Sequence, residues 1–296
     1  MTDVSFEFFP PKTDKGLDNL RRTAAELASY GPRFMSVTYG AGGSERDRTL
    51  NTVTDLNTRV PVPVASHLTP VGSSLDDLDL TIDEVVAAGI DHLVVLRGDP
   101  PPDADPTTMA VSTAADLVSH LRSRPDGDRF EISVAAYPET HPRAASPQAD
   151  LDSLKDKLDR GATRAITQFF FDPDVYLRFL DRARAAGITQ PIIPGIMPVI
   201  SYAGIARFAE RCSASIPDWL TSRLADLDDD PELRTPVAAA IVTEQVRRLV
   251  DAGIDEVHIY TLNQRTLPAA VCRNLDLGRA PVPAGSSPAP GENGAP

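Results

Sequence analysis

Eight short runs of β-branched, aliphatic and aromatic residues recur along the chain, and a helical pattern follows each of them. The runs begin near residues 4, 34, 62, 92, 130, 164, 191 and 256. Strands that alternate with helices favour a parallel sheet, and eight such units are typical of a (β/α)8 barrel of roughly 250 residues. We therefore predict an α/β protein that forms a single-domain TIM barrel over residues 1–280.

An open, doubly wound sheet is the alternative, because it uses the same alternation of strands and helices. It would not explain why several polar residues fall at or just after the predicted carboxyl ends of strands: Glu7, His67, Asp99, Tyr137, Gln168 and Asn263. In a closed barrel these ends meet at one rim, where such enzymes hold their active sites. The barrel is preferred because it gives these residues one shared pocket.

Three segments lie outside the repeat. The interval between the seventh and eighth runs predicts extra helices around the acidic run Asp226–Asp230, which we expect to be a solvated cap and not a metal site. The tail, residues 281–296, contains five prolines and three glycines, which predicts disorder. The glycine loop Gly40–Ser44 enters a helix and could cradle a phosphate, but without the GxGxxG order a simple turn is favoured.

Composition limits the classes of partner. The 42 acidic and 29 basic residues give a formal charge of −13, which opposes binding to nucleic acid or to an anionic membrane. Cys212 and Cys272 form no CxxC pattern, so neither a zinc site nor a disulfide framework is indicated. No apolar run reaches the roughly 18 residues of a membrane span, and no signal-peptide pattern precedes the first strand. We expect a soluble, cytoplasmic protein.

Glu7 is the single charged residue in the aromatic run Val4–Phe9. Burial of a carboxylate there costs several kcal/mol unless the group is paired, or else its pKa rises and it remains protonated. Glu7 is therefore a candidate proton donor, and the alternative is a structural ion pair with a barrel Arg or Lys. His67 can likewise be a hydrogen-bonded structural residue, and Asp99 can cap its strand with Arg97.

The rim residues do not suit hydrolysis, because they include no Ser-His-Asp order, no cysteine nucleophile and no metal-binding spacing. Gln168 lies among aromatic residues, where an unpaired amide costs roughly 1–3 kcal/mol. A flat heterocyclic ligand would supply its partners. An apolar slot with one acid and a few hydrogen-bonding groups suits a planar redox cofactor.

Eight motifs together resemble the 5,10-methylenetetrahydrofolate reductase family, over about residues 4 to 278. They follow the order of that family and include every predicted strand. The motifs are Phe6-Glu-Phe-Phe-Pro-Pro11, Val37-Thr-Tyr-Gly-Ala-Gly-Gly43, His67-Leu-Thr69, Leu96-Arg-Gly-Asp99, Ala135-Ala-Tyr-Pro-Glu139 with His141, Arg164-Ala-Ile-Thr-Gln-Phe-Phe-Phe-Asp172, Pro194-Gly-Ile-Met-Pro198 and Tyr260-Thr-Leu-Asn263.

The resemblance implies a barrel containing FAD that takes hydride from NADH or NADPH and, in a ping-pong order, reduces methylenetetrahydrofolate to 5-methyltetrahydrofolate for methionine synthesis. Glu7 matches the general acid that protonates folate N10 and opens the five-membered ring, with a pKa raised toward neutrality. Asp99 matches the carboxylate that stabilises the resulting iminium cation. Gln168 matches the amide that contacts folate and nicotinamide in turn, and Tyr202 stands where the family often has a stacking Phe.

The resemblance also implies a set of positions that hold FAD. These are Thr38, His67, Arg97, Gly98, Asp99, Tyr137, His141, Asp150, Lys157 and Ala162. Arg97 and Lys157 would provide positive charge for the pyrophosphate. Three residues differ from the family pattern: Thr113 replaces a usual Tyr, Ser153 an Asn, and Gln264 an Arg that is displaced here to Arg265.

Two alternatives remain beside the flavin-dependent reductase. One is direct transfer of hydride from NADH without a flavin, which the three departures favour. The other is a folate- or flavin-binding barrel without redox activity, which would not need the acid Glu7. The resemblance also makes a homo-oligomer possible.

Overall fold

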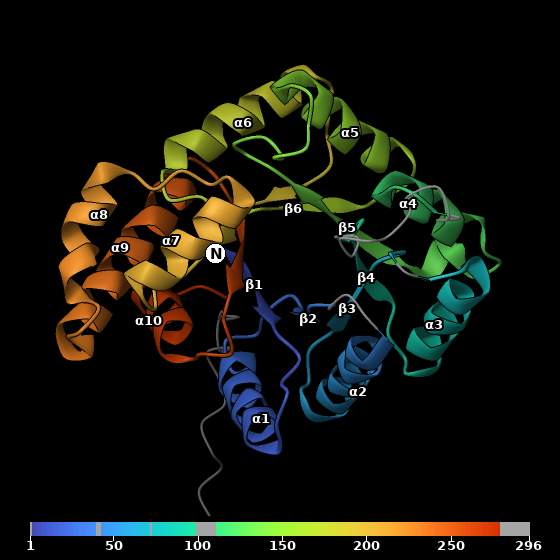
Figure 1. The fold of residues 1–296 in the computed structure, drawn as a ribbon, viewed down its shortest axis with the longest axis horizontal. Helices are drawn as coiled ribbons and strands as arrows, with labels where there is room; N and C mark the ends of the chain where they lie inside the picture. Colours follow the sequence, from blue (N-terminus) through green and yellow to red (C-terminus); the bar gives the residue numbers. More distant parts are fainter. Residues whose placement is uncertain (1, 40–42, 72, 99–110, 279–296) are drawn as a thin grey trace, which may run out of the picture.

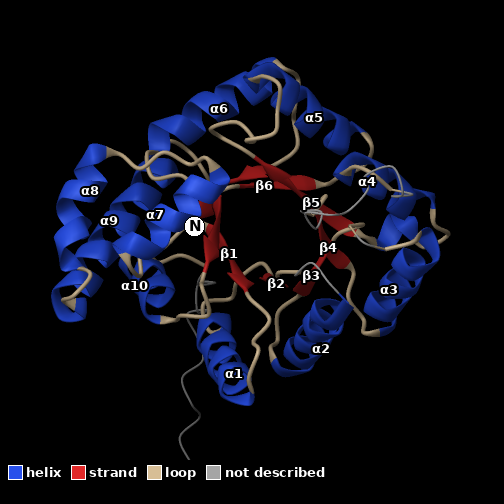
Figure 2. Cartoon of the chain, viewed as in Figure 1, coloured by secondary structure: helices blue, strands red, loops and turns tan. Residues whose placement is uncertain are grey.

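In the computed structural model, parallel strands form a barrel that is surrounded by helices (Figures 1 and 2). The strands occupy eight positions around the barrel, because β7 and β8 share one of them. The structure describes residues 2–39, 43–71, 73–98 and 111–278. The strand bounds in this part of the chain are β1 Asp3–Phe8, β2 Met35–Val37, β3 Val64–Leu68, β4 His92–Val95, β5 Glu131–Ala136, β6 Arg164–Thr167, β7 Ile192–Ile193, β8 Gly195–Ile196 and β9 Glu256–Tyr260. The predicted barrel is confirmed.

Ten α-helices and two short 3-10 helices accompany these strands in the described residues. The α-helices are α1 Asp14–Ala28, α2 Gly43–Arg59, α3 Leu75–Ala87, α4 Ala114–Ser123, α5 Pro147–Asp159, α6 Pro173–Ala185, α7 Tyr202–Cys212, α8 Asp218–Leu224, α9 Pro231–Asp251 and α10 Thr266–Leu275; the 3-10 helices are η2 Gly127–Arg129 and η3 Ala225–Leu227. Figure 1 shows α7, α8 and α9 together on one side, where they fill the interval before the last strand.

Polar caps set where several helices begin. Ser146 accepts a hydrogen bond from Ala149 N and is followed by a proline, which suits the first helical turn. Asp230 does the same for α9 by accepting from Leu233 N at 3.0 Å. This cap starts α9 at Pro231, so Pro236 lies inside the helix.

The seventh predicted strand, Pro191–Val199, is also shorter than expected and is divided into two pieces. β7 pairs with β6 and β8 pairs with β9, while Pro194 lies between them. Pro194 has no N–H to donate, but its carbonyl oxygen accepts from His258 N at 3.0 Å. The two short strands β7 and β8 therefore connect β6 to β9 and close the ring of strands.

The lumen of the barrel is polar for a buried core. His67, His92 and His258 come from three different strands, and all are buried. The Phe34 ring lies between two of them, with centroid distances of 4.3 Å to His92 and 5.6 Å to His258. Burial and the nearby Arg164 guanidinium lower the pKa of His92 to about 3, so this imidazole is neutral at physiological pH.

An ion pair closes the amino end of the lumen. Arg164 Nη1 donates to Glu256 Oε1 at 2.9 Å, and both side chains are buried. Arg164 also contacts Glu131. Each of these buried charges has a partner, so the amino end of the barrel is filled by a structural ion pair. Ligand sites in such barrels lie at the opposite, carboxyl end of the strands.

The remaining expectations concern the tail, the glycine loop, Asp99, the two cysteines, membrane spans and metal sites. The tail, the loop 40–42 and Asp99 lie outside the described residues. Cys272 is buried and Cys212 is partly buried. None of the helices in the described ranges combines the length and apolar character needed to cross a membrane. Within those ranges there is also no group of three or more His, Cys, Asp or Glu residues that could hold a metal ion.

Candidate active site

Glu7 lies near the carboxyl end of β1 and faces the lumen between two histidines. His258 Nε2 is 3.4 Å from Glu7 Oε2, and His67 Nε2 is 3.1 Å from the same oxygen, although the His67 contact lacks the geometry of a hydrogen bond. The Glu7 side chain is only 12% exposed. The partners of Glu7 are therefore imidazoles. The alternative prediction, a structural ion pair with a barrel Arg or Lys, was wrong.

A hydroxyl supports the second histidine from the far side. Ser5 Oγ lies 2.8 Å from His258 Nδ1, and Ser5 precedes Glu7 by two residues on the same face of β1. A hydroxyl that donates to Nδ1 leaves the proton of a neutral imidazole on Nε2, which then faces Glu7. Ser5, His258 and Glu7 thus form a connected polar chain in the lumen.

The two histidines reverse the expected pKa of Glu7. Burial alone raises this pKa, but attraction to His67 and hydrogen bonding to His258 outweigh burial and lower the pKa to about 2. The expectation of a raised pKa was wrong because the sequence does not reveal which side chains meet Glu7 in the lumen. In the ligand-free protein Glu7 is a carboxylate.

The motif Tyr260–Asn263 fixes the backbone that carries Glu7. Thr261 N and Thr261 Oγ1 both donate to Glu7 O, at 3.0 and 2.7 Å. Asn263 Oδ1 accepts from Phe9 N at 2.9 Å, and Asn263 Nδ2 donates to Phe9 O at 2.8 Å. Leu262 and Asn263 adopt left-handed conformations, with φ of 51° and 55°. This uncommon backbone turns the Asn263 amide toward β1.

Gln168 follows β6, and Tyr260, which pairs in register with Glu7, reaches toward the end of that strand. Gln168 Oε1 accepts from Phe169 N at 3.1 Å, and its amide nitrogen has no hydrogen-bond partner among the described residues. The Tyr260 hydroxyl donates to Thr167 O at 2.7 Å. A Cβ at Gly195 would come within 2.1 Å of Thr167 O, so this close packing requires glycine.

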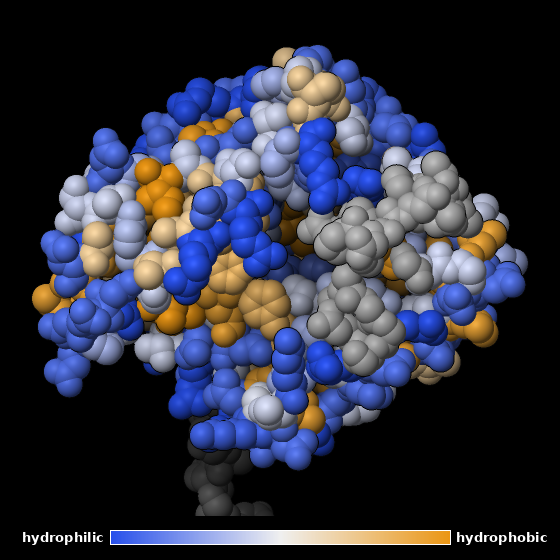
Figure 3. Space-filling model, in the orientation of Figure 1, coloured by the Kyte–Doolittle hydropathy of each residue, from blue (hydrophilic) through white to orange (hydrophobic). Residues whose placement is uncertain are grey.

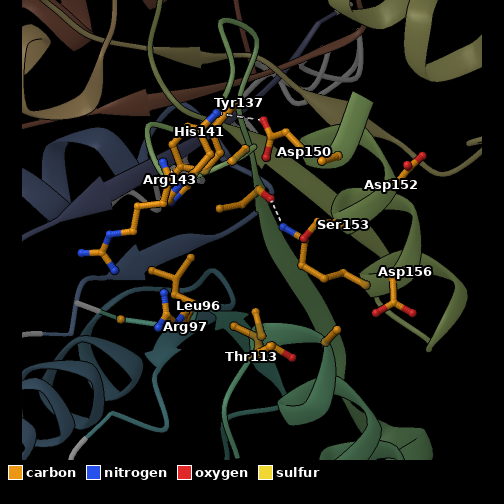
Figure 4. A pocket seen from close by; sticks show the side chains of 18 residues that line it. Leu96, Arg97, Thr113, Tyr137, His141, Arg143, Asp150, Asp152, Ser153 and Asp156 are labelled. Carbon is orange, nitrogen blue, oxygen red and sulfur yellow. Dashed lines mark hydrogen bonds between the residues drawn. The ribbon is translucent and has the colours of Figure 1, made fainter. Parts of the chain in front are cut away.

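A cavity of about 630 Å³ opens beside the lumen between β4, β5, α4 and α5 (Figure 4). Its lining includes six of the residues expected to hold the cofactor, namely Arg97, Gly98, Tyr137, His141, Asp150 and Lys157. Leu96 and Ala135 also line it, and both follow the lumen-facing alternation of their strands. One wall of the cavity therefore lies at the carboxyl ends of β4 and β5, at the same end of the barrel as Glu7.

Lys157 supplies a cation inside this cavity. Its ammonium donates to Ala135 O, and burial lowers its pKa to about 8 despite the neighbouring Asp150 carboxylate. Asp152 and Asp156 also line the cavity, but Figure 4 shows both on the outer side of α5, where Asp156 pairs with Arg160 and Asp152 with Gln148. An anionic ligand would thus meet Lys157 directly.

The loop after β5 is held in place by an acid from α5. Asp150 Oδ2 accepts from His141 N at 2.9 Å. The His141 ring packs edge-on against Tyr137, with centroids 4.5 Å apart. Gly98, across the cavity, has a φ of 78°, which a residue with a side chain rarely adopts.

Comparison with known proteins agrees with this arrangement. A family model described as "Methylenetetrahydrofolate reductase" matches residues 1–276. The chain belongs to the methylenetetrahydrofolate reductase family. It is 45% identical to 5,10-methylenetetrahydrofolate reductases of Pectobacterium carotovorum and Escherichia coli, over 93% of this chain and about 90% of each relative. The expectation of an oxidoreductase of this family is confirmed.

A plant relative and a solved structure extend the comparison. "Methylenetetrahydrofolate reductase (NADH) 1" of Arabidopsis thaliana is 39% identical over 93% of this chain and 48% of its own length. A Clostridium thermocellum protein described as binding two copies of 5-methyl-5,6,7,8-tetrahydrofolic acid has a similar fold, with a TM-score of 0.61 and 15% identity over 93% of this chain and 94% of that one.

Ala162 and Tyr202, which the family resemblance assigned to ligand binding, do not line the cavity. Ala162 is buried in the helix-facing core beside the amino end of β6, and it does not line the cavity. Its amide donates to Lys157 O, so it can influence the cavity only through the end of α5. Tyr202 packs in the α7–α8 cluster, and its hydroxyl lies 2.9 Å from Thr221 Oγ1. That position favours a structural role for Tyr202.

The departures from the family pattern also have local explanations. Thr113 caps α4 by accepting from Asp116 N at 3.0 Å, and Ser153 is exposed on α5. Gln264 stands where the family usually has an arginine. The next residue, Arg265, pairs with Glu26 of α1 at 3.1 Å and so does not substitute for that arginine at the rim. Thr38, on the lumen side, donates its backbone N–H to Phe8 O.

His258 was missed by sequence reasoning. A signal was present, because Glu256, His258 and Tyr260 alternate in the last strand and therefore share one face. The register of β1 against β9, Ser5 with His258 and Glu7 with Tyr260, is what brings that face to Glu7.

Proposed function

We propose that the protein uses FAD and a reduced nicotinamide to convert 5,10-methylenetetrahydrofolate to 5-methyltetrahydrofolate. The observation that carries this proposal is the presence of two sites at one end of the barrel, a lumen with one carboxylate between imidazoles and a side cavity with a buried cation. A planar ring system suits the first site, and a linked anionic group suits the second.

The side cavity fits the diphosphate-bearing part of FAD. Lys157 is a buried cation whose ammonium donates to a backbone carbonyl, Ala135 O, and an anion beside it would offset the cost of its burial. Arg97 and the backbone of Gly98 lie on the facing wall, while Tyr137 and His141 offer aromatic surface. When bound, the flavin accepts and donates hydride at the lumen end of this cavity.

Glu7 is the proposed proton donor to folate N10. Because its pKa is about 2, Glu7 is ionised in the ligand-free protein, and its affinity for a proton depends on the contacts with His67 and His258. Displacement of either imidazole contact by a bound ligand would raise the affinity of Glu7 for a proton. A positioned acid contributes about 10²–10⁴-fold to the rate.

Gln168 and Asp99 complete the proposed site. The unpartnered amide nitrogen of Gln168 can donate to a ring carbonyl, first of nicotinamide and then of folate. Asp99, which lies outside the described residues, would stabilise the cation formed when the five-membered ring opens. Both ligands would use the same lumen in turn, which gives a ping-pong order.

Flavin-free transfer of hydride from NADH is the second candidate, and the Thr113 cap favours it because that side chain offers the cavity no ring. The decisive assay follows NADH oxidation with methylenetetrahydrofolate, with and without added FAD, alongside the visible spectrum of the purified protein. Turnover that requires FAD supports the first candidate, and undiminished turnover by a colourless protein supports the second.

The variant Glu7→Gln tests the role of the acid. It keeps the shape of the side chain but cannot donate a carboxylic proton, so we expect reduction of the flavin by NADH to persist and reduction of folate to be lost. The two half-reactions are measured separately by stopped-flow absorbance. Equal loss of both would contradict the proposed role.

A further inference from the structure

The alternation of side chains along β1 continues past its last assigned residue. Phe6 and Phe8 are fully buried in the helix-facing core, whereas Glu7 faces the lumen. Phe9 N and O both bond to Asn263, on the same side as the bond from Glu7 O to Thr261. Residue 9 is therefore still extended, and its ring projects from the same face as Glu7, at the mouth of the barrel.

The Phe9 ring is 39% exposed although its backbone is fixed at both polar atoms. Exposed hydrophobic residues elsewhere, such as Leu80, lie on the outer helices, where single apolar side chains are ordinary. Phe9 instead stands at the carboxyl rim, where ligands enter. Figure 3 shows hydrophobic side chains beside a recess near the centre of this face.

The position of Phe9 relative to Glu7 identifies what the ring would meet. Two residues along an extended strand span about 6.6 Å, so Phe9 stands one side-chain layer above Glu7 toward solvent. In folate, N10 is bonded directly to the p-aminobenzoyl ring. If Glu7 delivers a proton to N10, that ring lies close to the Glu7 carboxylate, and Phe9 stands next to it on the solvent side.

We propose that Phe9 is a specificity-determining residue that stacks against the p-aminobenzoyl ring of the folate substrate. This inference rests on the proposed function. Asn263 acts as a positioning residue, because its two hydrogen bonds hold the Phe9 backbone. The ring bonded to N10 distinguishes the folate from a bare pterin, so Phe9 would discriminate between these two ligands.

The test compares two ligands on the FAD-containing enzyme by isothermal titration: 5-methyltetrahydrofolate and 5-methyltetrahydropterin, which lacks the p-aminobenzoylglutamate. Replacing an aromatic stacking partner weakens binding by about 3- to 10-fold for Phe9→Leu and about 10- to 100-fold for Phe9→Ala. We expect these losses for the folate alone, with the pterin unaffected. Phe9→Tyr should bind folate like the unaltered protein.

Two controls separate stacking from damage to the fold. Trp219→Leu removes an aromatic of similar exposure on α8, and it should leave both affinities unchanged. The far-UV circular dichroism spectrum and the thermal midpoint of Phe9→Leu should match those of the unaltered protein. Equal binding of folate by Phe9→Leu and the unaltered protein overturns this inference alone, as does an equal loss for both ligands. If the unaltered protein binds no folate, the proposed function itself fails.

Discussion

The buried ammonium of Lys157 makes the stability of the ligand-free protein depend on pH in a defined direction. Its pKa is lowered from 10.5 to about 8. At 1.36 kcal/mol per pKa unit, this corresponds to about 3 kcal/mol, or about 2–3 kcal/mol once partial exposure is allowed for. The cost is complete below pH 8 and disappears as the pH rises toward 10.5, because the unfolded chain then binds more protons than the folded one.

Lys157→Met removes the charge but keeps the length of the side chain. It also leaves Ala135 O without the donor that Lys157 provides, at a cost of about 1–2 kcal/mol. At pH 7 the variant should therefore be more stable than the unaltered protein by about 1 kcal/mol. At pH 10 the order should invert, because neutral lysine still donates to Ala135 O without the cost of a buried charge.

Urea unfolding followed by circular dichroism at pH 7 and pH 10 measures this difference. Lys155→Met is the matched control, because Lys155 is exposed on the same helix and pairs with Asp159 for at most about 0.5 kcal/mol. A difference between Lys157→Met and the unaltered protein that stays constant with pH would refute the reasoning. Added FAD should stabilise the unaltered protein more than Lys157→Met.

Two further predictions concern the barrel itself. Arg164→Met should destabilise the protein by about 3 kcal/mol, because it leaves buried Glu256 with only the half-exposed Arg33 guanidinium at 3.8 Å, and Arg164→Met with Glu256→Met should recover much of the loss in thermal unfolding. Gly195→Ala should cost about 3 kcal/mol, because the new Cβ would meet Thr167 O at 2.1 Å. Gly204→Ala, whose nearest contact would be 3.4 Å, should change stability by less than about 1 kcal/mol in the same assay.

The barrel could be predicted because its signals are local. Each strand is a short apolar run, and each cap, such as Asp230 before Pro231, is read within a few residues. The division of the seventh strand into β7 and β8 at Pro194 was harder to predict from the sequence. A proline in a strand indicates an interruption, but it does not say that both pieces still pair with their neighbours.

The chemistry of the rim depended on contacts between residues far apart in the sequence. Glu7 was found from its charge among aromatic residues, but the direction of its pKa is set by His67, 60 residues away, and His258, 251 residues away. Lys157 was found only through the family resemblance, because a lysine on a charged helix carries no sign that its ammonium turns inward.

The pairing of the first strand with the last has a consequence for biosynthesis. β1 leaves the ribosome early, yet its neighbour β9 begins only at residue 256. Until then Glu7 lacks His258, Phe9 lacks the Asn263 amide, and one edge of the sheet has no partner. A nascent chain therefore cannot close the barrel until β9 has been made, and a chain that stops before residue 256 would keep an open sheet edge prone to association.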